Sequence, residues 1–421
     1  MDTATESTRT PFAGPSLDEI EAARAIVGLV AQPTPIETSR YLTDVIGSPV
    51  ILKCENLQRT GSYKIRGAYN RLSKLTAEER ERGVVAASAG NHAQGVAFAA
   101  RELGIHATIF MPVGVAIPKF QATRAYGADV VLSGSIVDET LRAAADFAAE
   151  TGAVFIPPFD HPDVIAGQGT LGLEILDEVP DVSTIVVPIG GGGLISGVAS
   201  AVKQRAALEG RTIRVIGVQA ANAAAYPASL EAGEPTEIGL VATIADGIAV
   251  SKPGILNFAI VRDAVDAVVT VTEDDIARAL LVLLERAKLV VEPAGAAGVA
   301  AILAGLVPAD ADGSVVAILS GGNIDPLLMQ RVIAHGLAAA DRYLRLTIML
   351  PDRPGQLARI AEILAGVNAN VVEVLHTRHG NGLQLSQVEL DLSVETRGTE
   401  HREQVIHALR QAGYDPVLKE D

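Results

Sequence analysis

Short apolar stretches, each followed by a loop and then by a longer helix-forming stretch, repeat through most of the 421-residue chain. The apolar stretches are rich in Val, Ile and Ala, which suits strands buried on both faces of a parallel sheet. A first series has predicted strands at 84–87, 107–111 and 129–132, with helices at 93–102, 118–126 and 138–150. A second series has predicted strands at 154–156, 184–189, 213–219, 267–271 and 315–319, with helices at 164–178, 194–208, 273–285, 294–306 and 325–340.

Two such series predict an α/β protein with two doubly wound parallel sheets. We expect a small lobe at about 83–158 inside one larger domain, 17–340. The composition agrees, because 48% of the residues are apolar, only 4% are aromatic, and there are 40 Gly and no Trp. Ala, Val, Ile and Leu must therefore fill the core. Ser16 and Glu19 have the spacing of a capping box, which predicts a first helix from there to about Val30.

The pattern changes at Tyr343, where a second domain is predicted at 343–421. Its predicted elements are strand 344–350, helix 356–366, strand 370–378, strand 383–394, helix 400–412 and a short strand near 416–418. This βαββαβ order is the ferredoxin-like pattern. Gly380-Asn381-Gly382 predicts a hairpin, and Asp352-Arg353-Pro354-Gly355 a turn before the first helix. No nucleophile or acid/base pair is evident here, so we expect regulation and not catalysis.

The charge and the cysteine content exclude several classes of protein. A formal charge of −16 argues against nucleic acid and anionic membranes as partners. The single cysteine, Cys54, excludes a disulfide within the chain and fits the cytoplasm. Residues 182–202 carry no charge, but Pro188 and four consecutive glycines interrupt any membrane-spanning helix there. Residues 1–16 are polar, without the pattern of a secretion signal.

Lys64 is the first candidate for covalent chemistry. It lies in Ser62-Tyr63-Lys64-Ile65-Arg66-Gly67-Ala68, where a polar turn precedes a predicted helix at 63–75. A lysine in the first turn of a helix meets the positive end of the helix dipole, which disfavours its charged form. A neutral lysine amine can form a Schiff base with the aldehyde of pyridoxal phosphate. The alternative is a solvated lysine beside a turn, so a phosphate loop and a ring partner must be sought elsewhere.

Gly190-Gly191-Gly192-Gly193 is the candidate phosphate loop. It lies between a predicted buried strand and a helix N-terminus, where backbone N–H groups and the helix dipole favour an anion. A tight turn alone needs one or two glycines, and each further glycine costs conformational entropy. A Walker loop is excluded, since no Gly-Lys-Ser/Thr follows. A dinucleotide fingerprint also fits badly, because Ser196 occupies its third glycine position and Gln219 stands where an acidic ribose contact is expected.

Two further loops follow predicted strands at the edge where α/β sheets bind ligands. Ser88-Ala89-Gly90-Asn91-His92 offers amides, a hydroxyl and a side-chain amide, a neutral set of donors that suits a carboxylate. A helix cap is the alternative for this loop. Ser320-Gly321-Gly322-Asn323 follows the strand at 315–319. If a pyridoxal ring lies there, Ser320 can hydrogen-bond its nitrogen without forcing protonation, which favours β-elimination over transamination.

These four motifs, in this order, resemble those of the fold type II pyridoxal phosphate enzymes. The closest branch contains threonine dehydratase (threonine ammonia-lyase) and serine racemase, and the resemblance runs from about Ile20 to Ala340. Shorter stretches agree as well, namely Ala166-Gly167-Gln168-Gly169-Thr170, Thr243-Ile244-Ala245-Asp246-Gly247 and Glu292-Pro293-Ala294-Gly295. The C-terminal segment resembles an ACT domain, a common amino-acid sensor. The fold implied for 17–340 is that of the tryptophan synthase β chain.

The resemblance implies a role for individual residues of this chain. Lys64 is the implied catalytic residue and holds pyridoxal 5'-phosphate covalently. The other implied cofactor contacts are Tyr63, Asn91, Gly190, Gly191, Gly192, Gly193, Leu194 and Ser320. The implied contacts of the substrate carboxylate are Ser88, Ala89, Gly90, Asn91 and His92.

Two departures from the branch narrow the expectation. Serine racemases tend to have a second serine where Ala89 stands, and without its hydroxyl we do not expect racemisation. The same branch places acidic metal ligands after the strand that here ends in Gln219. This chain has Gln219 and Ala225 instead, so no metal site is expected there.

The expected reaction is dehydration and deamination of L-threonine to 2-oxobutanoate and ammonia, with L-serine giving pyruvate. The alternatives are a serine racemase, a hydroxyaspartate dehydratase, or a non-catalytic amino-acid sensor. Relatives are typically homodimers or homotetramers, and the role in isoleucine synthesis or threonine breakdown stays open. An amino-acid effector, with isoleucine first and valine as its antagonist, is expected at the turn that contains Asp352, Pro354 and Gly355.

Overall fold

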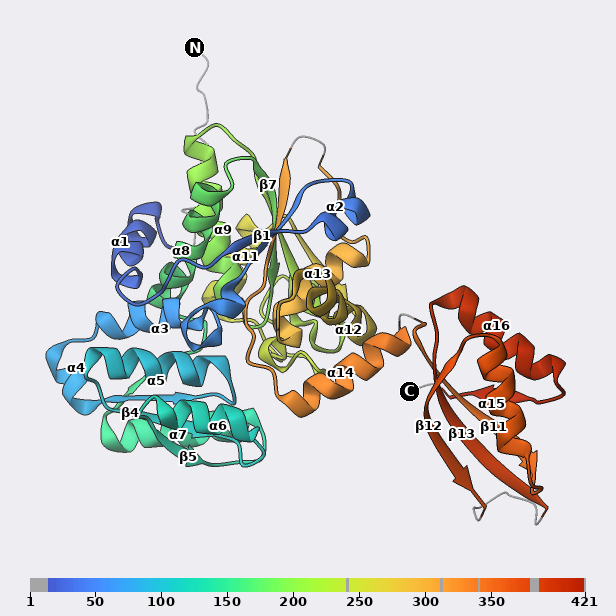
Figure 1. The fold of residues 1–421 in the computed structure, drawn as a ribbon. Coiled ribbons are helices and arrows are strands. Elements are labelled where there is room, and N and C mark those ends of the chain that lie inside the picture. Colours follow the sequence, from blue (N-terminus) through green and yellow to red (C-terminus); the bar gives the residue numbers. More distant parts are fainter. Residues whose placement is uncertain (1–13, 240–241, 311–312, 340, 379–385, 420–421) are drawn as a thin grey trace. The chain divides into compact units, whose positions relative to one another are not determined.

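The computed structural model describes residues 14–239, 242–310, 313–339, 341–378 and 386–419 (Figure 1). The chain forms two compact units, Met1–Asp325 and Pro326–Asp421. The second unit therefore begins with a helix that the sequence analysis placed at the end of the first domain. Each unit has its own sheets and its own core.

A six-stranded sheet is the centre of the first unit. Its order is β1-β2-β10-β7-β8-β9, and all neighbours are parallel except β1 and β2. The strands are β1 (Ile36–Thr38), β2 (Val50–Lys53), β7 (Val182–Pro188), β8 (Arg214–Ala220), β9 (Ala267–Val271) and β10 (Ser314–Ile318). Alternate residues of β7 face opposite sides: Ile185 and Val187 belong to a core with helices α8 and α9, whereas Val186 lies near Gly298 of α13. Both faces are buried, as the apolar composition predicts.

A four-stranded parallel sheet forms a small lobe in the same unit. Its order is β5-β4-β3-β6, with β3 (Val84–Ala87), β4 (Ala107–Met111), β5 (Asp129–Leu132) and β6 (Val154–Phe155). β6 opens the second series in the sequence, but it pairs with β3 and so belongs to the small sheet. Val84 and Ala86 pack toward α3 and α5, and Val85 and Ala87 pack toward α7. This sheet is also covered on both faces.

Helices cover the two sheets of this unit. Their bounds are α1 (Leu17–Val27), α2 (Arg40–Ile46), α3 (Lys64–Ser73), α4 (Ala77–Arg82), α5 (Asn91–Leu103), α6 (Ile117–Ala125), α7 (Val137–Thr151), α8 (Pro162–Glu178), α9 (Gly193–Leu208), α10 (Ala225–Ala232), α11 (Ile255–Ala264), α12 (Glu273–Val282) and α13 (Pro293–Leu303). Short 3-10 helices include η1 (Glu55–Leu57), η2 (Arg59–Gly61), η3 (Ala221–Ala223) and η4 (Asp246–Ile248). A π-helical turn, η5 (Leu283–Ala287), follows α12. The capping box of Ser16 and Glu19 is present, with both of its hydrogen bonds.

The second unit is an antiparallel sheet of order β12-β13-β11-β14. Its elements are α14 (Pro326–Ala339), β11 (Tyr343–Pro351), α15 (Gln356–Gly366), β12 (Asn370–Thr377), β13 (Gln387–Glu395), α16 (Thr399–Gln411) and β14 (Pro416–Leu418). Alternate residues of β11, such as Leu346 and Ile348, pack with α15 and α16 in a common core. From β11 onward the order is βαββαβ, which confirms the predicted ferredoxin-like pattern. The predicted hairpin at Gly380-Asn381-Gly382 lies outside the described residues.

Two further observations concern candidate features of the sequence. Among the described residues, no helix combines the length and the apolar character that crossing a membrane requires. Cys54 is fully buried after β2, and burial raises the pKa of its thiol to about 12. A thiol that stays protonated is a poor nucleophile, so Cys54 is a packing residue.

Candidate functional site

Lys64 lies where the loops that follow three parallel strands meet. The Tyr63 N–H donates to the carbonyl of Ser320, 3.1 Å away, and Ser62 forms a β-bridge with Gly321. Asn323 Nδ2 donates to Asn91 Oδ1 at 2.8 Å. The structure thus joins the Lys64 motif, the Ser88–His92 loop and the Ser320 loop, although these lie far apart in the sequence. This is the carboxyl edge of the strands, where α/β proteins bind ligands.

The Lys64 amine is held in a site that disfavours its charge. Lys64 is the first residue of α3, and its Nζ donates to the carbonyl of Pro158 at 2.9 Å and lies 5.3 Å from the centre of the Tyr63 ring. Burial lowers the pKa of Lys64 to about 8, against the opposing attraction of Glu292. The sequence analysis attributed such a shift to the helix dipole, whereas burial is the largest cause in the structure. The amine is therefore available as a nucleophile or base near neutral pH.

A buried ion network fixes the helix that carries Lys64. Arg66, two residues further along α3, donates to Glu55 at 2.8 Å and to Glu174 of α8 at 2.7 Å. Its side chain is 3% exposed and that of Glu55 is 0% exposed. Lys53 of β2 pairs with the same Glu174 and with Glu178, each at 2.7 Å. The network connects the sheet, α8 and α3, so it sets where the start of α3 lies.

Gly190 to Gly193 connect β7 to the N-terminus of α9, as predicted. Each of the last three glycines has a packing reason to lack a side chain, because a Cβ at Gly191 would come within 2.4 Å of the Phe159 ring and one at Gly193 within 2.9 Å of Phe159 Cβ. A Cβ at Gly192, where φ is +106°, would lie 2.0 Å from the Tyr226 hydroxyl. Local packing thus gives these three positions a reason to be glycine in addition to the predicted anion site.

The anion site at this loop depends instead on the start of α9. The N-cap residue of α9 is Gly192, which has no side chain that could bond to the amides of the first turn. The first amides of a helix have no partner inside the helix, so those of Gly193 and Leu194 remain available for an anion. The Tyr226 hydroxyl donates to the Gly191 carbonyl at 3.2 Å and holds the loop from below.

Gln219 and Ala225 lie next to Tyr226, whose hydroxyl bonds to the same loop. The Gln219 side chain accepts a hydrogen bond from the Tyr226 backbone N–H at 2.8 Å, and both Gln219 and Ala225 are buried. Gln219 therefore supports the tyrosine that holds the glycine loop. The Gln219 carbonyl oxygen already accepts from the Tyr226 N–H, and the methyl group of Ala225 has no donor atom for a cation.

The Ser88–His92 loop connects β3 to α5. The Gly90 N–H donates to Ser88 Oγ at 3.1 Å, and Asn91 begins the helix. His92 is buried, and its Nε2 donates to the Ile156 carbonyl at 2.9 Å. Burial and the nearby Lys64 lower the pKa of His92 to about 3, so the imidazole is neutral. The imidazole is thus a packing group. Only the backbone N–H of His92 can make the predicted contact with a carboxylate. Ala89 is half-buried in the loop.

Glu292 is a site residue to which the sequence analysis gave no role. It is buried at the N-cap position of α13 without capping that helix, and its Oε1 instead accepts from Asn91 Nδ2 at 2.6 Å. Burial and the nearby Asp246 raise the pKa of Glu292 to about 7. In the sequence, an acidic residue before Pro293 is typical of an ordinary helix start. Only the hydrogen bond with the distant Asn91 identifies Glu292 as a site residue. Glu292 and Asn323 together fix the orientation of Asn91.

Several buried hydroxyls around Lys64 have no hydrogen-bond partner in the described part of the chain. Ser62 Oγ and Thr60 Oγ1 are buried without a hydrogen bond, and the Ser320 hydroxyl also has none among the described residues. Buried polar groups are normally paired, and unpaired ones mark sites where a ligand binds. A reactive amine, an open helix N-terminus and spare hydroxyls together fit a small molecule that carries a carbonyl, a phosphate and a ring nitrogen.

The family comparison agrees with this chemistry. Residues 27–321 match the family described as pyridoxal-phosphate dependent enzyme, and residues 344–413 match the ACT domain. The chain belongs to the pyridoxal-phosphate dependent enzymes. Among the curated proteins, the L-threonine ammonia-lyase of Geobacter sulfurreducens is 48% identical over 381 residues, which are 90% of this chain and 94% of that protein.

Solved structures give the same relationship. Threonine deaminase isoform 2 from Solanum lycopersicum has a TM-score of 0.70 and 37% identity, over 77% of this chain and 95% of that one. Maize serine racemase has a TM-score of 0.71 and 35% identity, over 78% of this chain and 99% of that one. The predicted family and the fold type II class are confirmed, with pyridoxal phosphate as the cofactor of the family.

The predicted effector residues lie at an exposed turn of the second unit. Asp352 and Pro354 are exposed, and Gly355 is the N-cap of α15 with φ +89°. A Cβ at Gly355 would meet nothing within 4 Å, so its backbone angle and not a lack of space calls for glycine. Arg378 Nη2 lies 3.6 Å from Asp352 Oδ1.

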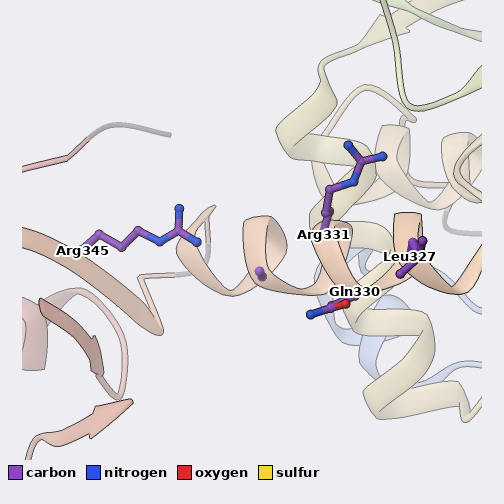
Figure 2. A pocket seen from close by; sticks show the side chains of 5 residues that line it. Leu327, Gln330, Arg331 and Arg345 are labelled. Carbon is purple, nitrogen blue, oxygen red and sulfur yellow. The ribbon is translucent and has the colours of Figure 1, made fainter. Parts of the chain in front are cut away.

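A separate cavity of about 520 Å³ lies between α14 and β11. Its lining residues are Leu327, Gln330, Arg331, Ala334 and Arg345. Figure 2 shows that Arg345 extends from β11 toward α14, the helix that carries Arg331. None of the predicted effector residues lines this cavity.

Proposed function

We propose that this chain is a threonine ammonia-lyase that converts L-threonine to 2-oxobutanoate and ammonia. The water lost in the elimination is taken up again when the nitrogen is released, so the net products are only these two. L-Serine gives pyruvate and ammonia in the same way. The observation that carries the proposal is the Lys64 amine, whose pKa is lowered to about 8 at the junction of the three loops. The 48% identity to an L-threonine ammonia-lyase supports the choice of substrate.

Pyridoxal phosphate, when bound, supplies the electron sink that makes the Cα–H bond of an amino acid acidic. We assign its covalent attachment to Lys64, its phosphate to the backbone of Gly190–Gly193 and Leu194, and its ring hydroxyl to Asn91. Ser320 provides a neutral partner for the ring nitrogen, and Tyr63 flanks the ring. Lys64, Tyr63, Asn91 and Ser320 lie at the junction described above, where the buried hydroxyls of Ser62 and Thr60 have no hydrogen-bond partner among the described residues. The glycine loop is near Lys64 through Phe159, which crowds Gly191 and Gly193 and follows Pro158, the acceptor of the Lys64 amine.

Lys64 moves the proton in the proposed reaction. Its amine takes the α-proton of the substrate, which requires the neutral form that burial favours. The Ser88–His92 loop binds the substrate carboxylate through its backbone amides and the Ser88 hydroxyl. Asn91 is held by Glu292 and Asn323, so its side chain has a fixed direction. This rigidity positions the ring and the substrate for elimination.

A serine racemase is the second candidate, because the maize enzyme shares the fold. Racemisation needs an acid/base group on the face of the substrate opposite Lys64, and Ala89 provides no hydroxyl there. A panel of L-threonine, L-serine and hydroxyaspartate separates the candidates. We expect keto acid from the first two, and D-serine formation at a comparable rate would contradict the proposal.

The ACT domain suggests regulation by an amino acid, with Asp352, Pro354 and Gly355 as the proposed effector contacts. These residues lie at an open helix N-terminus, which suits a carboxylate.

We further propose a homodimer or homotetramer in the cytoplasm. Exposed apolar side chains, such as those of Leu29 and Ile255, support the assembly. The single buried thiol of Cys54 supports the cytoplasm. Light scattering of the purified protein tests the assembly, and a monomer would contradict it.

A further inference from the structure

An ion pair connects helix α6 of the small lobe to the short helix η4 beside the proposed substrate loop. Lys119 of α6 and Asp246 of η4 are 2.7 Å apart, with side chains 14% and 53% exposed. Neither residue belongs to the contacts assigned above. A partly exposed ion pair adds little to stability, because solvent screens it. Its position is therefore more informative than its strength.

The Lys119 side chain lies close to Gly90 of the Ser88–His92 loop. A Cβ built at Gly90 would be 3.6 Å from Lys119 Nζ and 3.8 Å from its Cδ. Asp246 raises and Lys119 lowers the pKa of Glu292, which contacts Asn91 in that loop. A cation thus lies within reach of a loop whose other donors are all neutral.

We propose that Lys119 is a substrate-binding residue whose ammonium attracts the α-carboxylate of the amino acid held by residues 88–92. This inference rests on the proposed function, since it takes that loop as the carboxylate site. A lysine ammonium has three hydrogen-bond donors, so it can bind Asp246 and a second anion at the same time. Asp246 repels that second anion, because both are negatively charged and close to the same ammonium. Lys119 and Asp246 must therefore have opposite effects on carboxylate affinity.

The alternative is a structural latch, in which the ion pair only holds the lobes together, and it predicts different effects of the two variants. If the pair only holds the lobes together, removal of either partner breaks the same contact and has the same effect on every ligand. Opposite signs for the two variants, confined to ligands with a carboxylate, distinguish the proposed role from a latch.

The test compares two ligands that differ by one carboxylate. L-Alanine and ethylamine both carry the amine that reacts with the enzyme-bound cofactor, and neither has a β-hydroxyl to lose. Their dissociation constants are measured from the visible absorbance of the bound cofactor, and the ratio of ethylamine to L-alanine gives the carboxylate preference. Lys119→Gln should lower this ratio roughly tenfold, the loss expected for a charged hydrogen bond. Asp246→Asn should raise it several-fold.

Lys74→Gln is the matched control, because Lys74 forms an ion pair of the same 2.7 Å length with Asp163. It should leave the ratio unchanged. Equal changes of the ratio in Lys119→Gln and Asp246→Asn, or no change in either, would overturn the proposal while leaving the lyase function intact. A wild-type protein without cofactor absorbance would overturn the lyase function and this inference together.

Discussion

Burial changes the protonation of both Lys64 and Glu292, and each group also affects the pKa of the other. Burial lowers the pKa of Lys64 to about 8 and raises that of Glu292 to about 7, and the opposite charge of each partner partly restores the ordinary value. Both groups thus change charge near neutral pH. Two perturbed groups that interact electrostatically in this way are typical of catalytic sites.

The protonation of Lys64 gives the first prediction. Covalent loading of the cofactor-free protein needs the neutral amine, so its rate should rise with pH, pass its midpoint near the Lys64 pKa of about 8, and level off above it. His92 has a pKa of about 3 and should add no step between pH 5 and 9. Stopped-flow absorbance with excess pyridoxal phosphate measures the profile. A midpoint near 10.5, the ordinary lysine value, would contradict the proposed burial effect.

Glu292→Gln provides the second prediction. The negative charge of Glu292 raises the pKa of Lys64, so its removal should move the midpoint to lower pH, on the order of one pH unit. The variant keeps an amide that can still accept from Asn91. A shift to higher pH would show that another group controls the Lys64 amine. Arg40→Gln, at an exposed position, is the control and should leave the midpoint in place.

Lys64 and the loops around it can be singled out from the sequence, because each follows a strand or begins a helix, and their roles stay predictions. Glu292, Lys119 and Asp246 cannot be singled out in this way, since their proposed roles depend on contacts between distant parts of the chain. Asn91 and Glu292, for example, are 201 residues apart. The crowding of Gly191–Gly193 by Phe159 and Tyr226 could not be predicted either, because these residues are not neighbours in the sequence.

The element that carries Lys64 depends on the network around Arg66. Arg66→Met would leave Glu55 with an uncompensated buried charge and Glu174 with Lys53 as its remaining partner, and we expect it to lower the free energy of unfolding by about 3–5 kcal/mol. Chemical denaturation measures the change. Arg24→Met removes an exposed pair with Asp177 and should cost less than about 1 kcal/mol. Equal effects of the two variants would mean that Arg66 does not anchor α3.

The β7–α9 connection gives a further prediction. Gly192→Ala would place a Cβ 2.0 Å from the Tyr226 hydroxyl at a φ of +106°, so the loop must move. We expect a loss of about 1–3 kcal/mol in stability from overpacking and a weaker affinity for pyridoxal phosphate. Gly233→Ala has φ +77° and nothing within 4 Å, so it isolates the backbone cost. Unchanged cofactor affinity in Gly192→Ala would contradict the assigned phosphate loop.

At the level of elements, the predicted strands of the small sheet match closely because their apolar stretches are short and bounded by loops. The strand β1 was missed, since its three residues are exposed and depend on pairing with β2. The helix α11 was missed for a related reason. Its first amides are capped by Asp160, which lies 95 residues earlier in the chain. Local sequence contains no trace of such a cap.

At the scale of the whole molecule, the two units imply separate catalytic and regulatory roles. We expect isoleucine to change the activity of the full chain through a coupling of about 1–3 kcal/mol, a factor of about 5–150. A protein truncated after Ala340 should stay active and lose the response. Initial rates with and without isoleucine, valine or threonine measure this. No binding and no rate change with any of them would contradict the regulatory role.

The central claim is that Lys64 makes this chain a lyase for L-threonine. The most direct measurement follows 2-oxobutanoate and ammonia from L-threonine for the purified wild-type protein and for Lys64→Ala, with the visible absorbance of bound cofactor recorded in parallel. We predict equal amounts of the two products from the wild type. In Lys64→Ala the protein-linked absorbance should be absent and the rate lower by at least about 10³-fold, since both the attachment and the base are removed. A wild-type protein that forms no 2-oxobutanoate, or a Lys64→Ala variant that keeps its rate, would contradict the account.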